Sequence, residues 1–171
     1  MKRTSIVSLI LFFSVLSFAQ VKEDASPYNF SAGIRVGFLN AGTAKYFLLE
    51  RIAIEAIAGI NLLNKGPQAS LLIEYHHPHI FQIDNLYLFY GGGISTGYKT
   101  GRTIDEKTGI TYNYAYGHFS TEGIFGFEYN FTELIDFPIA ASSDLKPAIE
   151  IYPYVRPSLV SGAISIRYIV K

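Results

Sequence analysis

The feature that most constrains the fold is an alternation of side chains with a period of two along residues 116–131. One set of alternate positions, which includes Phe125 and Phe127, is aromatic, apolar or small, and the other, which includes Glu122 and Glu128, is mostly small, polar or acidic. Because successive side chains of a β-strand point to opposite faces, this pattern predicts one strand with an apolar and a polar face. An apolar outer face backed by carboxylates is typical of a strand that crosses a lipid bilayer.

The composition fits a membrane barrel better than a cytosolic enzyme. Charged residues make up 16% of the 171 residues and aromatic residues 15%, with 13 tyrosines and 13 phenylalanines, whereas soluble domains average roughly 25% charged residues. The formal net charge of zero gives no indication of a nucleic-acid partner. The chain contains no cysteine, which excludes disulfides, thiolate metal sites and a cysteine nucleophile. The length favours a single domain.

The first 19 residues have the features of a secretory signal peptide. Lys2 and Arg3 provide a positive start, and the apolar run of residues 6–18 is too short for a comfortable spanning helix. Ala19 and the small residue two positions before it predict cleavage before Gln20. We therefore predict a signal peptide over residues 1–19 and an outer-membrane barrel domain over residues 20–171, with an uncleaved membrane anchor as the alternative.

The rest of the chain is divided by turn signals into eight predicted strands. After residue 20 no apolar run approaches the roughly 18 residues of a spanning helix, and strands satisfy their backbone groups in a membrane only when the sheet closes. We therefore expect an all-β protein, an eight-stranded antiparallel up-and-down transmembrane β-barrel. The expected strands are residues 29–38, 43–49, 52–60, 68–76, 86–99, 116–131, 137–151 and 158–170.

Two of these strands leave alternatives open. Residues 43–49 alternate poorly, so their facing stays undecided, and a short helical turn is the alternative. Residues 52–60 contain good helix formers, so a helix is the alternative there. Turns are predicted at residues 40–42, 50–51 and 64–67, and the longest polar segment, residues 100–113, is predicted to be a loop. An even strand number after a signal peptide places both termini on the periplasmic side and the loops near Asn40, Asn64, Thr100 and Tyr152 outside.

The polar faces of these strands would bring charges into the barrel interior. An eight-stranded barrel is just wide enough for side chains to fill it, and a buried charge costs several kcal/mol unless it is paired. We therefore predict a plug of ion pairs and hydrogen bonds centred on Arg35, Lys146 and Arg167, with a gated ion path as the alternative. The inward charges are Lys99 and Glu150 together with the predicted lumen polar network of Arg35, Glu55, Glu74, Glu122, Glu128, Asp144, Lys146 and Arg167.

Three histidines close together in the sequence are a candidate metal site. His76, His77 and His79 surround a proline near a turn. Solvated imidazoles are the commoner state of such a turn, and no carboxylate close in sequence completes a convincing ligand set. We expect neither a metal site nor a cofactor.

A second pattern is a candidate for nucleophilic catalysis. His118, Ser120 and Glu122 place a base, a hydroxyl and an acid on one strand face, similar to the His-x-Ser pair and Glu of barrel lipid A deacylases. A nucleophile needs its base within hydrogen-bond reach and its acyl substrate nearby, whereas the predicted facing turns all three away from lipid. We expect no catalysis.

Interfacial aromatic belts are predicted from tyrosines near the strand ends, namely Tyr28, Tyr98, Tyr112, Tyr114, Tyr116, Tyr129, Tyr152 and Tyr154.

Four short motifs, at residues 43–48, 88–93, 123–129 and 144–148, occur in an order that resembles the small eight-stranded outer-membrane barrels of Bacteroidetes-type bacteria. These proteins are broadly like the outer-membrane protein A and X barrels. The resemblance implies an eight-stranded barrel, in a family that largely has no assigned biochemical activity. This chain departs from the usual pattern in having no tryptophan in the Asp144 motif and in ending with Lys171 instead of an aromatic residue.

These observations predict an integral outer-membrane barrel with a plugged lumen and a structural or surface-interaction role. We expect a monomer whose partners are outer-membrane lipids, lipopolysaccharide and the barrel-assembly machinery, and no nucleic acid. A surface partner would bind through the loop from Thr100 to Asn113. The second hypothesis is a secreted, soluble, lipocalin-like barrel that binds a small hydrophobic ligand, and the third is an outer-membrane lipid-modifying enzyme.

Overall fold

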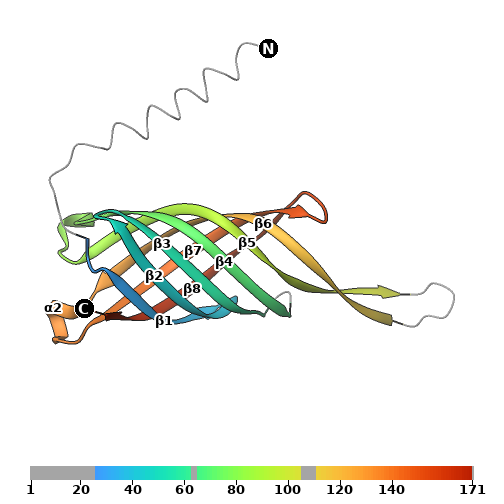
Figure 1. Cartoon of the computed structure of the whole chain (residues 1–171), viewed down its shortest axis with the longest axis horizontal. Helices are drawn as coiled ribbons and strands as arrows, with labels where there is room; N and C mark the ends of the chain where they lie inside the picture. The colour runs from blue at the N-terminus through green and yellow to red at the C-terminus, as the bar shows by residue number, and fades with distance from the viewer. Residues whose placement is uncertain (1–25, 63–64, 105–110, 171) are drawn as a thin grey trace, which may run out of the picture.

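The computed structural model describes residues 26–62, 65–104 and 111–170, and these residues form a closed antiparallel β-barrel (Figure 1). Each strand is hydrogen-bonded to the next one in the chain, and β8 closes the sheet on β1. This confirms the predicted eight-stranded up-and-down barrel. The predicted signal peptide lies outside the described residues. The strands are β1 (Phe30–Gly37), β2 (Leu39–Leu49), β3 (Ile52–Asn61), β4 (Gly66–His77), β5 (Leu86–Ile104), β6 (Thr111–Asn130), β7 (Ile139–Tyr152) and β8 (Arg156–Val170).

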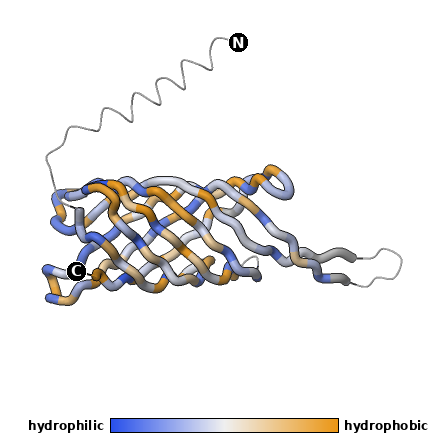
Figure 2. The backbone as a smooth tube through the Cα atoms, viewed as in Figure 1, coloured by the Kyte–Doolittle hydropathy of each residue, from blue (hydrophilic) through white to orange (hydrophobic). Residues whose placement is uncertain are grey.

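Alternation of polarity along the strands decides which side chains face inward. In β6, Glu122 and Glu128 are buried in the interior, while Phe125 and Phe127 between them are exposed on the outer wall. Figure 2 shows the same change between hydrophilic and hydrophobic residues along the walls of the barrel. The predicted facing is confirmed for β1, β3, β4, β5, β6, β7 and β8. The helical alternative for residues 52–60 is wrong, because β3 pairs with both β2 and β4 along its whole length.

The first turn and β2 differ from the prediction. Residues 40–42, predicted to form a turn, lie inside β2, and the chain reverses around Phe38 instead. The side chain of Asn40 accepts a hydrogen bond from the backbone N–H of Gly37 at 3.1 Å. The sequence leaves the facing of β2 open, and the structure places Lys45 and Phe47 in the interior. Both faces of β2 therefore carry large side chains, which explains its poor alternation.

The segment predicted as the longest loop is largely strand. β5 continues to Ile104 and β6 begins at Thr111, so residues 100–104 and 111–113 belong to a hairpin, and only 105–110 lie outside the described residues. β4 pairs with β5 no farther than Gly97. The hairpin therefore extends beyond the rest of the barrel, at the end opposite the C-terminus (Figure 1). Threonine and tyrosine favour strands, which explains why the ladder continues through a polar sequence.

Three connections lie at the end of the barrel that holds the C-terminus and the first described residues (Figure 1). The first is the predicted tight turn at Glu50 and Arg51. The second contains the short 3₁₀ helix η1 (Ile80–Gln82), and the third contains the one-turn helix α2 (Thr132–Ile135). No helix among the described residues is both long and apolar enough to cross a bilayer.

Candidate functional site

Two cations and three carboxylates form the centre of the barrel interior. The Nζ atom of Lys45 lies 2.7 Å from Glu74 Oε2, 3.1 Å from Glu128 Oε2 and 3.5 Å from Glu55 Oε2. The guanidinium of Arg167 donates to Glu55 Oε1 at 3.0 Å and also to Glu128. All five residues are at most 1% exposed. Because they come from β2, β3, β4, β6 and β8, this central charge cluster ties together strands on opposite sides of the barrel.

A β-bulge puts Lys45 into this cluster. A regular two-residue turn at positions 50–51 would pair Leu49 with Ile52 and carry Lys45 opposite Ala56, on the outer face. The register instead shifts between Phe47 and Leu49, so that Lys45 pairs directly with Glu55. One extra residue in one strand moves every following side chain to the opposite face. The bulge therefore decides that the ammonium group lies inside.

Aromatic rings pack beside the cluster toward the terminal end of the barrel. The imidazole of His76 stacks on Phe89, with ring centres 5.3 Å apart, and contacts Phe47 edge-on at 4.8 Å. Lys45 Nζ lies 4.4 Å from the centre of the Phe89 ring, a distance at which a cation is attracted to the ring face. Tyr28 packs edge-on against Phe47 at 5.0 Å. This packing excludes water from one side of the charges.

Tyr28 links this aromatic packing to the charges. Its hydroxyl donates to Glu128 Oε1 at 2.6 Å. Burial, together with the negative charge of Glu128, raises the pKa of the Tyr28 phenol, so it acts as a neutral donor. Tyr28 was predicted to lie in an interfacial aromatic belt, and this is wrong because its side chain is inside the barrel and 7% exposed.

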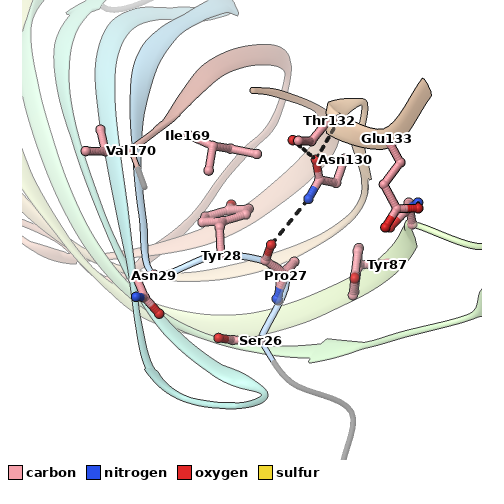
Figure 3. A pocket seen from close by; sticks show the side chains of 11 residues that line it. Ser26, Pro27, Tyr28, Asn29, Tyr87, Asn130, Thr132, Glu133, Ile169 and Val170 are labelled. Carbon is pink, nitrogen blue, oxygen red and sulfur yellow. Dashed lines mark hydrogen bonds between the residues drawn. The ribbon is translucent and has the colours of Figure 1, made fainter. Parts of the chain in front are cut away.

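A pocket of about 450 Å³ opens at the barrel end next to Tyr28 (Figure 3). Its wall is held by Asn130, whose side-chain amide donates to the carbonyl of Pro27 at 3.3 Å and whose side-chain oxygen accepts from Thr132 N–H at 3.0 Å. The other lining residues are Ser26, Asn29, Asn85, Tyr87, Glu133, Ile169 and Val170. Asn130 therefore joins the first described residues to the start of α2.

A second layer of the interior combines an ion pair with apolar side chains. The two Nη atoms of Arg35 donate to the two carboxylate oxygens of Asp144 at 2.5 and 2.6 Å. Such a paired geometry is the strong form of the arginine–carboxylate interaction. The interior also holds an apolar cluster of Leu39, Ile57, Leu72, Phe89 and Ile124.

The third group of charges lies toward the hairpin end. Lys146 Nζ lies 2.9 Å from Glu122 Oε2, and Gln68 donates to Glu122 Oε1 at 3.0 Å. Farther along, Glu150 Oε2 accepts from Lys99 at 2.5 Å and from Arg156 at 3.1 Å. The side chain of Arg156 is half-exposed. Glu150 and its two cations therefore lie where the barrel interior opens to solvent.

The eight residues of the predicted lumen network are all buried in the interior, but they fall into separate groups. Arg35 pairs with Asp144, Lys146 with Glu122, and Arg167 with Glu55 and Glu128. Glu74 pairs with Lys45, which sequence reasoning missed because the facing of its strand was undecided. The opposite charges of Lys45 and Glu55 were the available signal, but only the bulge brings them into register.

The candidate metal residues do not converge. His76 is 1% exposed inside the barrel, with its Nε2 atom 3.1 Å from Glu74 Oε2, so the expectation of a solvated imidazole is wrong for it. His77 is only partly buried, and the exposed His79 has Nδ1 3.3 Å from Asp84. Within residues 26–62, 65–104 and 111–170, no group of three or more His, Cys, Asp or Glu side chains could hold a metal ion.

The candidate catalytic residues also face the interior. His118, Ser120 and Glu122 are all buried, and the barrel wall separates them from the outer surface. Glu122 is already engaged by Lys146. The Nδ1 atom of His118 has no hydrogen-bond partner in the described part of the chain. The Nδ1 atom is therefore not held by a carboxylate, as it is in the base of a catalytic triad.

Comparison with known proteins identifies the fold alone. No family model matches the chain, and no curated protein matches it. Among solved structures, the crystal structure of the N-terminal β-barrel domain of Pseudomonas aeruginosa OprF is similar, with a TM-score of 0.55 and 16% sequence identity. The match covers 81% of this chain and 93% of that one. At this identity the likeness supports the eight-stranded barrel architecture.

Proposed function

We propose that the chain is an integral outer-membrane β-barrel with a lumen closed by side chains and a structural or surface-interaction role. The observation that carries this proposal is the inverted polarity of the barrel. Among the described residues, 34 large hydrophobic side chains are exposed, while the central charge cluster is buried. Burying one such side chain is worth roughly 1.5–3 kcal/mol. In water these exposed side chains would stay hydrated, and most of this free energy would not be gained. The apolar core of a bilayer removes them from water.

The distribution of the exposed side chains around the barrel supports a lipid environment. Ile34, Ile73 and Ile164 are 59–62% exposed and come from β1, β4 and β8, and every other strand also carries exposed apolar residues. Monomeric soluble proteins rarely expose apolar patches larger than a few hundred Å². A wall that is apolar all round needs a partner that surrounds it, and lipid does so.

The two ends of the barrel support one orientation in the membrane. The C-terminus and the first described residues lie together, and the long β5–β6 hairpin lies at the opposite end (Figure 1). Outer-membrane barrels have short periplasmic turns and longer extracellular connections. We assign the terminal end to the periplasm and the hairpin to the cell surface, where it would meet a surface partner. Export would depend on the signal peptide predicted over residues 1–19.

The paired charges and packed rings support a closed lumen. The central charge cluster, the pair of Arg35 with Asp144 and the pair of Lys146 with Glu122 fill successive parts of the interior. A lipocalin-like ligand site requires an apolar interior, so these charges argue against that alternative.

The third hypothesis, a lipid-modifying enzyme, requires access from the bilayer to Ser120. On the proposed function, cells that carry the Ser120→Ala variant should therefore keep unchanged lipid A acylation.

Cell fractionation with a gel-mobility assay tests the proposal. We expect the processed chain in the outer-membrane fraction, extractable only with detergent, and migrating faster on a gel before heating than after it. Recovery of the mature chain as a soluble monomer in detergent-free buffer would contradict the membrane location. Export by an uncleaved anchor would instead leave residues 1–19 on the purified protein, which mass spectrometry detects.

A further inference from the structure

Exposed apolar side chains continue beyond the strands, onto two connections at the terminal end of the barrel. The first connection, residues 78–85, contains η1, and the second, residues 131–138, contains α2. Their apolar turn residues are Phe81, Ile83, Leu134, Ile135 and Phe137, which are 46–77% exposed. Turns that face water alone have no need of such side chains. The two connections therefore require a partner of their own.

Hydrogen bonds join the two connections. The side-chain amide of Asn85 donates to Glu133 Oε2 at 2.7 Å. The backbone N–H of Asn130 donates to the carbonyl of Asn85 at 3.0 Å. The segment that carries Phe81 is thereby fixed to the segment that carries Leu134, and the apolar turn residues are presented from one supported structure.

The backbone holds Phe81 in an outward position. Phe81 has a φ of 57° and the following Gln82 a φ of 61°. Left-handed backbone is strained at residues other than glycine and persists where the surroundings require it. The result here is a phenylalanine that is 77% exposed.

The apolar turn residues are continuous with the outer wall. The ring of Phe81 lies 6.5 Å from that of Phe127 on β6, and the ring of Phe137 lies 6.1 Å from that of Tyr168 on β8. The connection between β2 and β3 differs, because its tip is formed by the charged residues Glu50 and Arg51. Whatever covers the wall beside Phe127 and Tyr168 also reaches the two apolar connections.

We propose that the apolar turn residues insert into the periplasmic leaflet of the membrane and contact phospholipid acyl chains. This inference rests on the proposed membrane location of the barrel. Lipid fits because the apolar turn residues extend the apolar outer wall, which the proposed function already places in the bilayer. The carboxylates of Asp84, Glu133 and Asp136 lie beside these residues in sequence and would reach the headgroup level. The Glu50 turn stays in water.

The absence of tryptophan from the sequence allows a direct test. Single tryptophans are introduced as Phe81→Trp or Leu134→Trp in the full mature chain. Glu50→Trp serves as the matched control for a turn in water, and Phe125→Trp as the control for the lipid-facing wall. Each variant is placed in phosphatidylcholine nanodiscs, which leave both faces open to water, and is quenched by brominated phosphatidylcholine or by aqueous iodide. The unheated gel mobility of each variant verifies folding.

We expect brominated lipid to quench the tryptophans at positions 81 and 134 as it quenches the one at 125. Iodide should quench them several-fold less than the tryptophan at 50, and their emission should be blue-shifted relative to it. Iodide quenching of both at the level of position 50, with normal lipid quenching at 125, would overturn this inference and leave the membrane barrel intact. Loss of lipid quenching at 125 as well would count against the proposed function itself. Leu134→Trp decides the outcome if Phe81→Trp does not fold.

Discussion

Lys45 of β2 and Glu55 of β3 are directly paired across the sheet, with Nζ 3.5 Å from Oε2 and both side chains inside the barrel. The same ammonium group also contacts Glu74 and Glu128. The pairing depends on the bulge between Phe47 and Leu49. A local irregularity near a turn therefore supplies one of the two cations on which three buried carboxylates depend.

The Lys45→Met variant should be strongly destabilised. The change keeps most of the side-chain volume but leaves Glu55, Glu74 and Glu128 with Arg167 as their remaining cation in the central charge cluster. Removing one partner of a buried ion pair typically costs about 3–5 kcal/mol. Urea titration in detergent micelles measures the free energy of unfolding, and Glu50→Gln at the exposed turn is the control. A loss no larger than that of the control would show that the ammonium group is dispensable.

Arg35 and Asp144 should behave as a coupled pair. Each single change, Arg35→Met or Asp144→Leu, leaves the charge of the remaining partner unpaired in the interior, where both side chains are only 1% exposed. The double variant removes both charges, so its loss of unfolding free energy should fall short of the sum of the single losses by about 1–3 kcal/mol. The same urea titrations measure all corners of the cycle. Additive losses would indicate that the two side chains contribute independently.

Gly93 should not tolerate a side chain. It faces the inner wall of β5, where an added Cβ atom would collide with the backbone oxygen of Leu71. Gly93→Ala should therefore reduce the free energy of unfolding by about 3 kcal/mol, the upper part of the range for overpacking. Gly42→Ala is the matched control, because its Cβ atom would lie 4.0 Å from the nearest backbone oxygen. Equal stability of the two variants would contradict the close approach of β4 and β5.

The purified protein should not conduct ions. In the proposed plugged lumen, the three groups of paired charges and the apolar cluster around Phe89 occupy the interior of an eight-stranded barrel, which has room for side chains but not for a water channel. Planar bilayer recordings should therefore show no unitary currents above those of detergent alone. Reproducible unitary currents that disappear in heat-unfolded samples would show that the plug opens.

The sequence was sufficient to predict the barrel and most of its facing because these depend on local alternation. A period of two along β6 or β8 indicates which side of the sheet each residue occupies. An apolar outer face indicates a membrane, in which a sheet must close into a barrel to satisfy its backbone groups. The buried positions of Arg35, Asp144, Lys146 and Arg167 follow from the same parity. The length of the β5–β6 hairpin was missed, since a polar segment can be either a loop or an exposed strand.

The partners of the buried charges were decided only by the tertiary structure. Register depends on how one strand pairs with its neighbour, so a single bulge at Leu48 decided the facing of Lys45, which the poor alternation of β2 leaves open. The stacking of His76 on Phe89 likewise depends on the pairing of β4 with β5. Alternation is a property of one strand and can be read along the chain, whereas register and contacts across the barrel exist only after the strands have closed around a common interior.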